Sequence, residues 1–143
     1  MVMQVSKIFS TDVEEIMKTL KIMSAIAFEL DNMITNEFYT KREILQELKN
    51  MTFFANRLKS IFTSILIKAQ KYKPRDIVFL NYLNNINEYI KKLNLIAQMS
   101  EVAYERDPDY NVKGVFRDLK TIIRYINLIK SELEKGIQKG LFM

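Results

Sequence analysis

Apolar residues recur at alternating intervals of three and four residues in four long stretches of this 143-residue chain. This spacing places them on one face of an α-helix, whereas a half-buried strand needs alternation at every second residue. The pattern is clearest over residues 41–72, where it holds for four heptads. The seam there consists of Ile44, Leu48, Met51, Ala55, Leu58, Phe62, Ile65, Ala69 and Tyr72. Such a seam buries itself against other helices, so we predict an all-α protein.

The same spacing predicts three further helices, which cover residues 12–35, 75–106 and 112–138. The helix over residues 75–106 has a wide apolar face, because a second apolar row runs beside its seam. That second row consists of Tyr82, Tyr89, Ile96 and Ala103. Gly136 and Gly140 indicate the end of the last helix. Residues 1–10 remain outside the predicted helices.

Local signals mark where the first three helices begin. Thr11 with Glu14, three residues later, matches the capping box that satisfies free N–H groups at a helix start. Thr40 with Glu43 does the same for the helix over residues 41–72. Pro74 then interrupts the pattern, because proline is accepted in the first turn of a helix but not in its interior. These signals support four separate helices joined by short connections.

Helices of similar length joined by short connections favour antiparallel neighbours. The predicted helices are roughly 24–32 residues long, or about 36–48 Å at 1.5 Å per residue. We therefore predict one domain, residues 1–143, folded as an up-down-up-down four-helix bundle with a left-handed twist. Helical hairpins paired across a dimer are the alternative arrangement. With 3 Gly and 2 Pro, the chain has too few turn formers for a β-sandwich or barrel.

The chain contains 0 His and 0 Cys, which excludes several classes of site. Catalytic arrangements of the Ser–His–Asp or Cys–His type cannot be built without these residues. The usual protein ligands of zinc, iron–sulfur and haem sites are also absent. Neither of the familiar glycine-rich phosphate-binding motifs occurs in the sequence. We therefore predict a protein that is not an enzyme and that binds no cofactor or metal ion.

One stretch partly matches a calcium-binding loop. Asp107, Asp109 and Asn111 occupy its positions 1, 3 and 5, and Asp118 falls at position 12. The match fails at position 6, where Val112 replaces the glycine of the sharp turn, and at position 12, which requires a glutamate. We interpret the stretch as an acidic turn between helices, in which Asp109 or Asn111 caps the last helix.

Two pairs of glutamates lie four residues apart, Glu43 with Glu47 and Glu101 with Glu105. Each pair shares a helix face, and paired carboxylates hold hard metal ions inside some helical bundles. A site of that kind must lie in the bundle core. Neither pair falls on an apolar seam, so we interpret both as solvated surface residues.

Positive charge gathers in two places, and the formal net charge is +5. Residues 48–75 contain seven cations and no acidic residue, with Lys68, Lys71, Lys73 and Arg75 closest together. In the last helix, the cations within about 60° of arc nearly opposite the seam are Lys113, Arg117, Lys120 and Arg124. These eight residues are candidate contacts for an anion or a nucleic acid, although charge runs are commonly just solvated.

Four aromatic residues flank the seams instead of lying on them: Phe28, Phe53, Phe54 and Tyr125. They fit two roles, which are to widen the core or to form a protein-binding patch. We favour the core, because the apolar stripe of a bundle helix is normally broad.

These observations favour a non-enzymatic helical-bundle interaction protein that acts through its surface as an adaptor, a regulator or an assembly subunit. Its partner would be another protein or a second copy of itself. The alternatives are a nucleic-acid-associated protein that contacts phosphates without sequence preference, and a structural protein of a microbial virus. No apolar run approaches the roughly 20 residues of a transmembrane helix. We expect a cytoplasmic location, or the virion or host cytoplasm for a viral protein.

Overall fold

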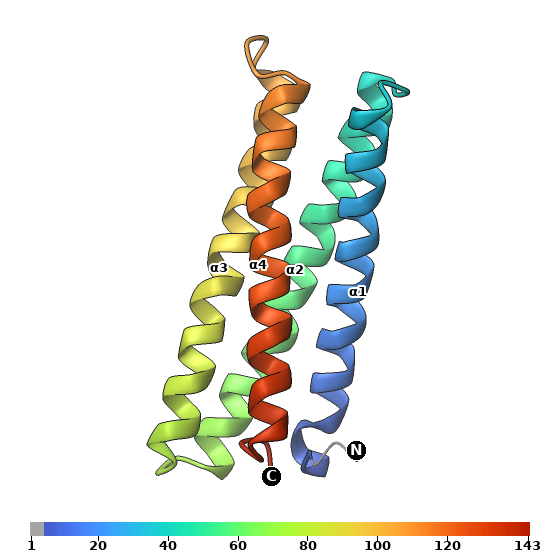
Figure 1. Cartoon of the computed structure of the whole chain (residues 1–143). Coiled ribbons are helices and arrows are strands. Elements are labelled where there is room, and N and C mark those ends of the chain that lie inside the picture. The colour runs from blue at the N-terminus through green and yellow to red at the C-terminus, as the bar shows by residue number, and fades with distance from the viewer. Residues whose placement is uncertain (1–4) are drawn as a thin grey trace.

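The computed structural model describes residues 5–143 and shows a four-helix bundle, with no strand in that range. Its helices are α1 (Lys7–Thr35), α2 (Lys41–Tyr72), α3 (Ile77–Arg106) and α4 (Val112–Gln138). Each helix runs antiparallel to the one before it (Figure 1). Consecutive helices pack together and α1 packs against α4, which leaves α1 diagonal to α3 and α2 diagonal to α4. The predicted up-down-up-down bundle is confirmed, and one chain closes it without a partner. Residues 1–4 of the predicted domain lie outside the described range.

The predicted seams form the core. All seam positions in the middle of the helices are buried, including Leu58 on α2 and Ile126 on α4. The burial predicted from the spacing is wrong only at helix ends, where Ile34 and Val112 are half-buried and Tyr72 is 52% exposed. A residue in the last turn of a helix has fewer neighbours above it, so the right angular position does not guarantee burial.

The first helix begins at Lys7, about one turn before the predicted start at Asp12. Its N-cap is Ser6, whose hydroxyl accepts a backbone N–H two residues further on. The predicted capping residue Thr11 therefore lies inside the helix. The extra turn is stabilised by Phe9, which is fully buried and extends the seam of α1 by four residues.

The other helix starts follow the sequence more closely. At α2 the capping box is present, with Glu43 N–H donating to Thr40 Oγ1 (3.2 Å) and Thr40 N–H to Glu43 Oε1 (2.9 Å). α3 begins two residues later than predicted, because Pro74 lies in the connecting turn and Asp76 provides the cap. Asn111 caps α4, as one of the two predicted candidates.

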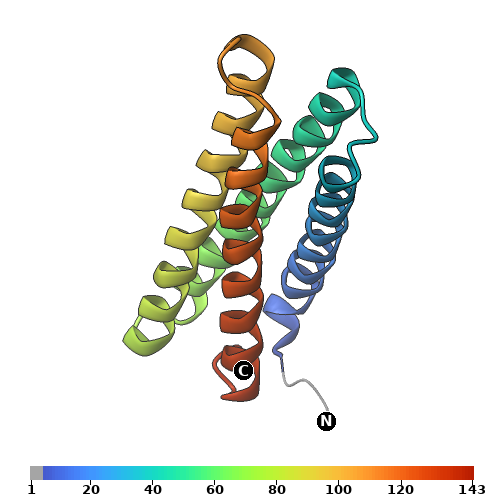
Figure 2. The same ribbon diagram turned by 45° about the horizontal axis from the view of Figure 1, so that its top comes forward.

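Aromatic residues close one end of the bundle. The rings of Phe9, Phe79 and Phe142 pack edge to face, with centroids 5.3–5.9 Å apart. Phe142 comes from the short segment after α4, and its carbonyl accepts the N–H of Ser6 at 2.9 Å. The start of α1 and the end of α4 are thereby joined, and both lie at the same end of the bundle (Figure 2).

The opposite end is more open. Towards the connections at residues 36–40 and 107–111, the α1–α2 hairpin diverges from the α3–α4 hairpin in both views (Figures 1 and 2). A hollow lies there, with Ile34, Tyr39, Val112 and Phe116 among its lining residues. This divergence is consistent with the half-buried state of Ile34 and Val112.

Candidate interaction surface

The cations predicted on α4 share one exposed face. We call them the α4 cation row, which consists of Lys113, Arg117, Lys120 and Arg124. All four side chains are exposed, because they lie opposite the seam that packs into the core. In the part of the chain that the structure describes, only Arg117 has an acidic partner, at 3.5 Å from Asp118. The row therefore forms a strip of positive charge along the outside of α4.

Two members of the row lie against aromatic rings of their own helix. The Lys120 Nζ is 4.8 Å from the ring centroid of Phe116, and the Arg124 Cζ is 5.4 Å from that of Tyr125. These cation–π contacts hold the stems of both side chains against the helix surface. Both charged groups remain exposed to solvent.

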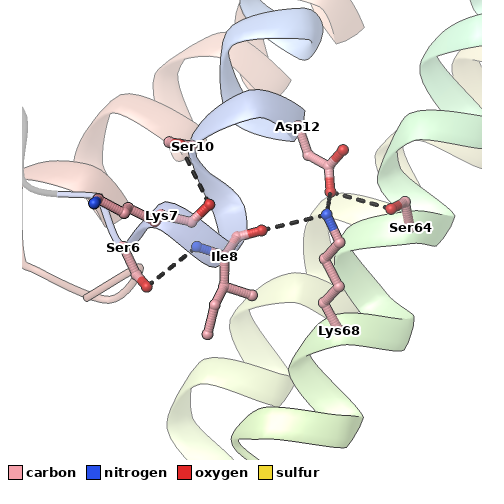
Figure 3. Close-up of polar contacts among 7 residues, drawn as sticks. All are labelled: Ser6, Lys7, Ile8, Ser10, Asp12, Ser64 and Lys68. Atoms are coloured by element: carbon pink, nitrogen blue, oxygen red, sulfur yellow. Dashed lines mark hydrogen bonds and ion pairs between the residues drawn. The ribbon is translucent and has the colours of Figure 1, made fainter.

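The cations at the end of α2 are not equivalent to this row. Lys68 donates to Asp12 Oδ2 (2.8 Å) and to the carbonyl of Ile8 (3.3 Å), and Asp12 also accepts the hydroxyl of Ser64 (Figure 3). These contacts join α2 to the first turns of α1. Lys68 is therefore part of the framework of the bundle and is a poor candidate for an external phosphate.

Lys73 has a similar internal role. Its ammonium group donates to the carbonyls of Leu141 and Met143 and lies 5.0 Å from the ring centroid of Phe79. It connects the end of α2 to the segment after α4. Of the predicted contacts in this part of the chain, only Lys71 and Arg75 stay on the exposed surface.

The structure does not bring the two groups of cations together. α2 and α4 lie diagonally across the bundle. The α4 cation row starts at the open end, whereas residues 68–75 lie at the aromatic end (Figure 1). The eight predicted cations therefore form two separate regions, and only the α4 cation row is a continuous exposed strip.

The polar side chains of the acidic turn stabilise the turn itself and the start of α4. Asp107 Oδ1 accepts the N–H of Asp109 at 2.9 Å, and Asn111 Oδ1 accepts the N–H of Lys113. Asp118 accepts the hydroxyl of Tyr110, which lies between α3 and α4. Burial, with this hydrogen bond as the second cause, raises the pKa of Tyr110 to about 12. Within residues 5–143 no three acidic side chains, the two glutamate pairs included, are grouped to hold a metal ion.

The flanking aromatic residues divide into two kinds. Phe54 and Tyr125 are partly buried and pack on the core, as predicted. Phe28 and Phe53 are exposed on the outside of α1 and α2, so their predicted role in the core is wrong. At 100° per residue, each lies more than about 100° from the middle of its seam, which is outside an apolar stripe of ordinary width.

An apolar surface on α3 was not indicated by the sequence pattern. Leu95, Met99 and Val102 are 58%, 60% and 41% exposed, and their spacing of four and three residues puts them on one face. This face is neither the seam of α3 nor the second row that packs towards α4. These residues form a third apolar row in the sequence, but helical spacing does not distinguish an exposed apolar row from a buried one. We call these three residues the α3 apolar row.

The α3 apolar row borders a groove between α3 and α4. Leu95 and Met99 form one side of the groove, and Arg117 and Thr121 belong to the other. Ile96, Ala103 and Tyr125, which are only partly exposed, line it as well. A second hollow begins at Leu95 and continues along α3 past Met99 and Val102 to Arg106. Together the groove and this shallow hollow form a mainly apolar surface beside the α4 cation row.

No family model, curated protein or solved structure matches this chain. Within residues 5–143, no helix is long and apolar enough to cross a bilayer.

Proposed function

We propose that this protein is a non-enzymatic binding module that recognises another protein through the α3 apolar row and the groove beside it. The observation that supports this proposal is the exposure of Leu95, Met99 and Val102 on one face. Neighbouring exposed apolar side chains bordered by polar residues are typical of interaction sites. An adaptor, a regulator and an assembly subunit, including one of a microbial virus, would all use such a face.

The packing of α3 explains why this row is available to a partner. The seam of α3 faces the core, and its second row meets α4 through contacts such as Tyr89 with Tyr125, whose ring centroids are 6.4 Å apart. The α3 apolar row lies on the remaining side, and nothing within residues 5–143 covers it. Covering three large apolar side chains would favour association, because it removes their surface from water.

The groove also has features that fit binding better than catalysis. Its ionisable groups include Tyr110 and Asp118, which are hydrogen-bonded to each other. Burial raises the pKa of the Tyr110 phenol to about 12, which is further from neutral pH than the ordinary pKa of a tyrosine. General acid–base catalysis favours a group that titrates near the working pH, and the Tyr110 phenol does not.

Affinity capture from the cells that encode the protein tests the proposal. The bait proteins are the wild type, Leu95→Glu combined with Met99→Glu, and Ile67→Glu as the control. Ile67 is 62% exposed and lies on α2, so its substitution places one of the two added negative charges at a similarly exposed apolar position away from α3. We expect wild type and control to retain the same partner and the double variant to lose it. Equal retention by all three baits would contradict the proposal.

Phosphate binding by the α4 cation row is a second candidate function. It is supported by the exposure of Lys113, Arg117, Lys120 and Arg124 on one side of α4. Contacts of this kind would be independent of nucleic-acid sequence, because backbone phosphates carry no base information. Titration of duplex DNA and RNA at several salt concentrations tests this candidate.

A further inference from the structure

We propose that the occupant of the α3–α4 groove is an amphipathic helix with acidic residues on both sides of its apolar face. This inference rests on the proposed function, since it names the partner of the same surface. A helix that lays its apolar side into a groove between two helices is a recurrent mode of peptide recognition.

The shape of the groove fits a short helix. On α3 it extends from Lys92 to Ala103, and on α4 from Arg117 to Tyr125. Eleven residues at 1.5 Å each give a length of about 16 Å, which is about three helical turns. A partner helix of that length presents apolar side chains at positions i, i+4 and i+7, the spacing of Leu95, Met99 and Val102.

The charges around the groove favour an acidic partner. Lys92 and Arg117 line the groove, and Arg106 lies at the end of the adjoining hollow. All three are exposed. These three cations outnumber the two nearby acids. Asp118 is 16% exposed, accepts the hydroxyl of Tyr110 and lies 3.5 Å from Arg117, and the exposed Asp107 accepts a backbone N–H. The groove therefore offers an apolar centre with a positive rim, which acidic residues on the partner would complement.

The same charges argue against a second copy of this chain. A two-fold symmetric dimer places the same patch of both protomers face to face. Lys92, Arg106 and Arg117 of one protomer would then face the same cations of its partner. A nucleic acid is also disfavoured here, since the α3 apolar row offers nothing to a phosphate backbone.

Amide NMR titration with three peptides of about 14 residues tests this inference. The first has leucines at i, i+4 and i+7 flanked by glutamates, the second has lysines in place of the glutamates, and the third is the acidic peptide with its order scrambled. We expect the acidic helix to shift amides at residues 92–103 and 117–125. It should bind about tenfold more tightly than the basic one, as expected from a few exposed ion pairs.

Charge reversal provides the matched control. Lys92→Glu combined with Arg117→Glu should reverse the preference, so that the basic peptide binds more tightly. Lys49→Glu combined with Lys59→Glu changes the net charge equally on the outside of α2, and should leave the preference unchanged. Equal binding of acidic and basic peptides, or no shifts with any peptide, would overturn the inference.

Two further measurements separate this inference from the proposed function. Sedimentation equilibrium that shows a dimer lost on Met99→Glu would identify a second copy as the occupant. Co-sedimentation with phosphatidylserine vesicles, lost on the same substitution, would identify a lipid surface instead. Either result overturns the acidic helix as the occupant.

If no peptide binds as expected while affinity capture depends on Leu95 and Met99, the inference fails and the proposed function stands. If capture does not depend on them, the proposed function fails.

Discussion

Gly136 lies against the ring of Tyr82, and this contact fixes how closely α3 and α4 approach at the aromatic end. A Cβ atom at position 136 would lie 2.1 Å from the Tyr82 hydroxyl oxygen. That hydroxyl donates to the carbonyl of Glu132 at 2.7 Å, so the ring is held in place. The sequence indicated Gly136 as a helix-end residue, and the structure places it in the last turn of α4, where it is buried.

Gly136→Ala should lower the free energy of unfolding by about 1–3 kcal/mol, because the added methyl group overpacks the contact with Tyr82. Urea denaturation of both proteins measures this difference. In a Tyr82→Leu background the same substitution should cost less, since the obstructing ring is gone and the two sites are coupled. Identical midpoints for Gly136→Ala and wild type would show that the ring moves away without cost.

Contacts of this kind could not be predicted from the sequence. Burial of Leu58 or Phe79 follows from helical spacing alone, because spacing fixes the face of a helix. The pairing of Tyr82 with Gly136, or of Lys68 with Asp12, depends on which helices become neighbours and on their relative axial positions. Residues far apart in the chain carry no local signal for that.

At the level of the elements, spacing predicted three of the four helices to within two residues at each boundary. The exception is α1, whose first turn depends on burial of Phe9 against Phe79 and Phe142. The exposure of the α3 apolar row was not predicted, for a different reason. Its residues have helical spacing, but α3 has neighbours on only two sides, and a third apolar row has no helix to cover it.

The assigned core positions can be tested on two helices at once. Leu58→Ala on α2 and Ile126→Ala on α4 should each lower the free energy of unfolding by about 2–5 kcal/mol, as truncations of buried Leu or Ile do. Both side chains are 1% exposed or less. Leu95→Ala is the matched exposed control and should leave stability nearly unchanged. Chemical denaturation measures the free energy of unfolding of all three variants. A Leu58→Ala variant as stable as the wild type would contradict the packing of Leu58 in the core.

The α4 cation row predicts a specific salt dependence if it binds nucleic acid. Four phosphate contacts would give a slope near −3.6 for the logarithm of affinity against the logarithm of salt concentration, at about 0.9 per phosphate. Changing all four cations to glutamine should flatten this slope and preserve the fold, because the row faces away from the core. Absence of binding by the wild type at low salt would exclude this candidate.

For the whole molecule, stability is expected to be uneven along the bundle axis. The aromatic end joins the start of α1, the end of α2 and the segment after α4 through Phe142 and Lys73. The open end has half-buried residues where the hairpins diverge. Local opening should therefore begin near residues 36–40 and 107–111.

Phe142→Ala should lower the free energy of unfolding by about 3–5 kcal/mol, which is typical for removal of a buried phenylalanine. Its ring is fully buried although it lies outside every helix. Thermal or urea unfolding measures the effect. Phe38→Ala changes an 86% exposed ring in the opposite turn and should have little effect. Comparable losses for the two variants would contradict the description of a closed and an open end.

The sequence predicted the architecture much better than the candidate site. The fold depends on four seams that can be found one helix at a time. The candidate interaction surface depends on which face each helix leaves uncovered, and only the assembled bundle determines that. For this reason the α4 cation row was predicted correctly as an exposed face, while Lys68 and Lys73 were not recognised as internal contacts.

Site-specific photo-cross-linking in the cells that encode the protein tests the central claim most directly. A photoreactive phenylalanine derivative is placed at position 99 on α3, and at position 67 on α2 as the control. The proposed function predicts a discrete protein adduct from position 99 that is absent from position 67. No protein adduct at position 99, or the same adducts from both positions, would contradict the claim that the outer face of α3 binds a protein partner.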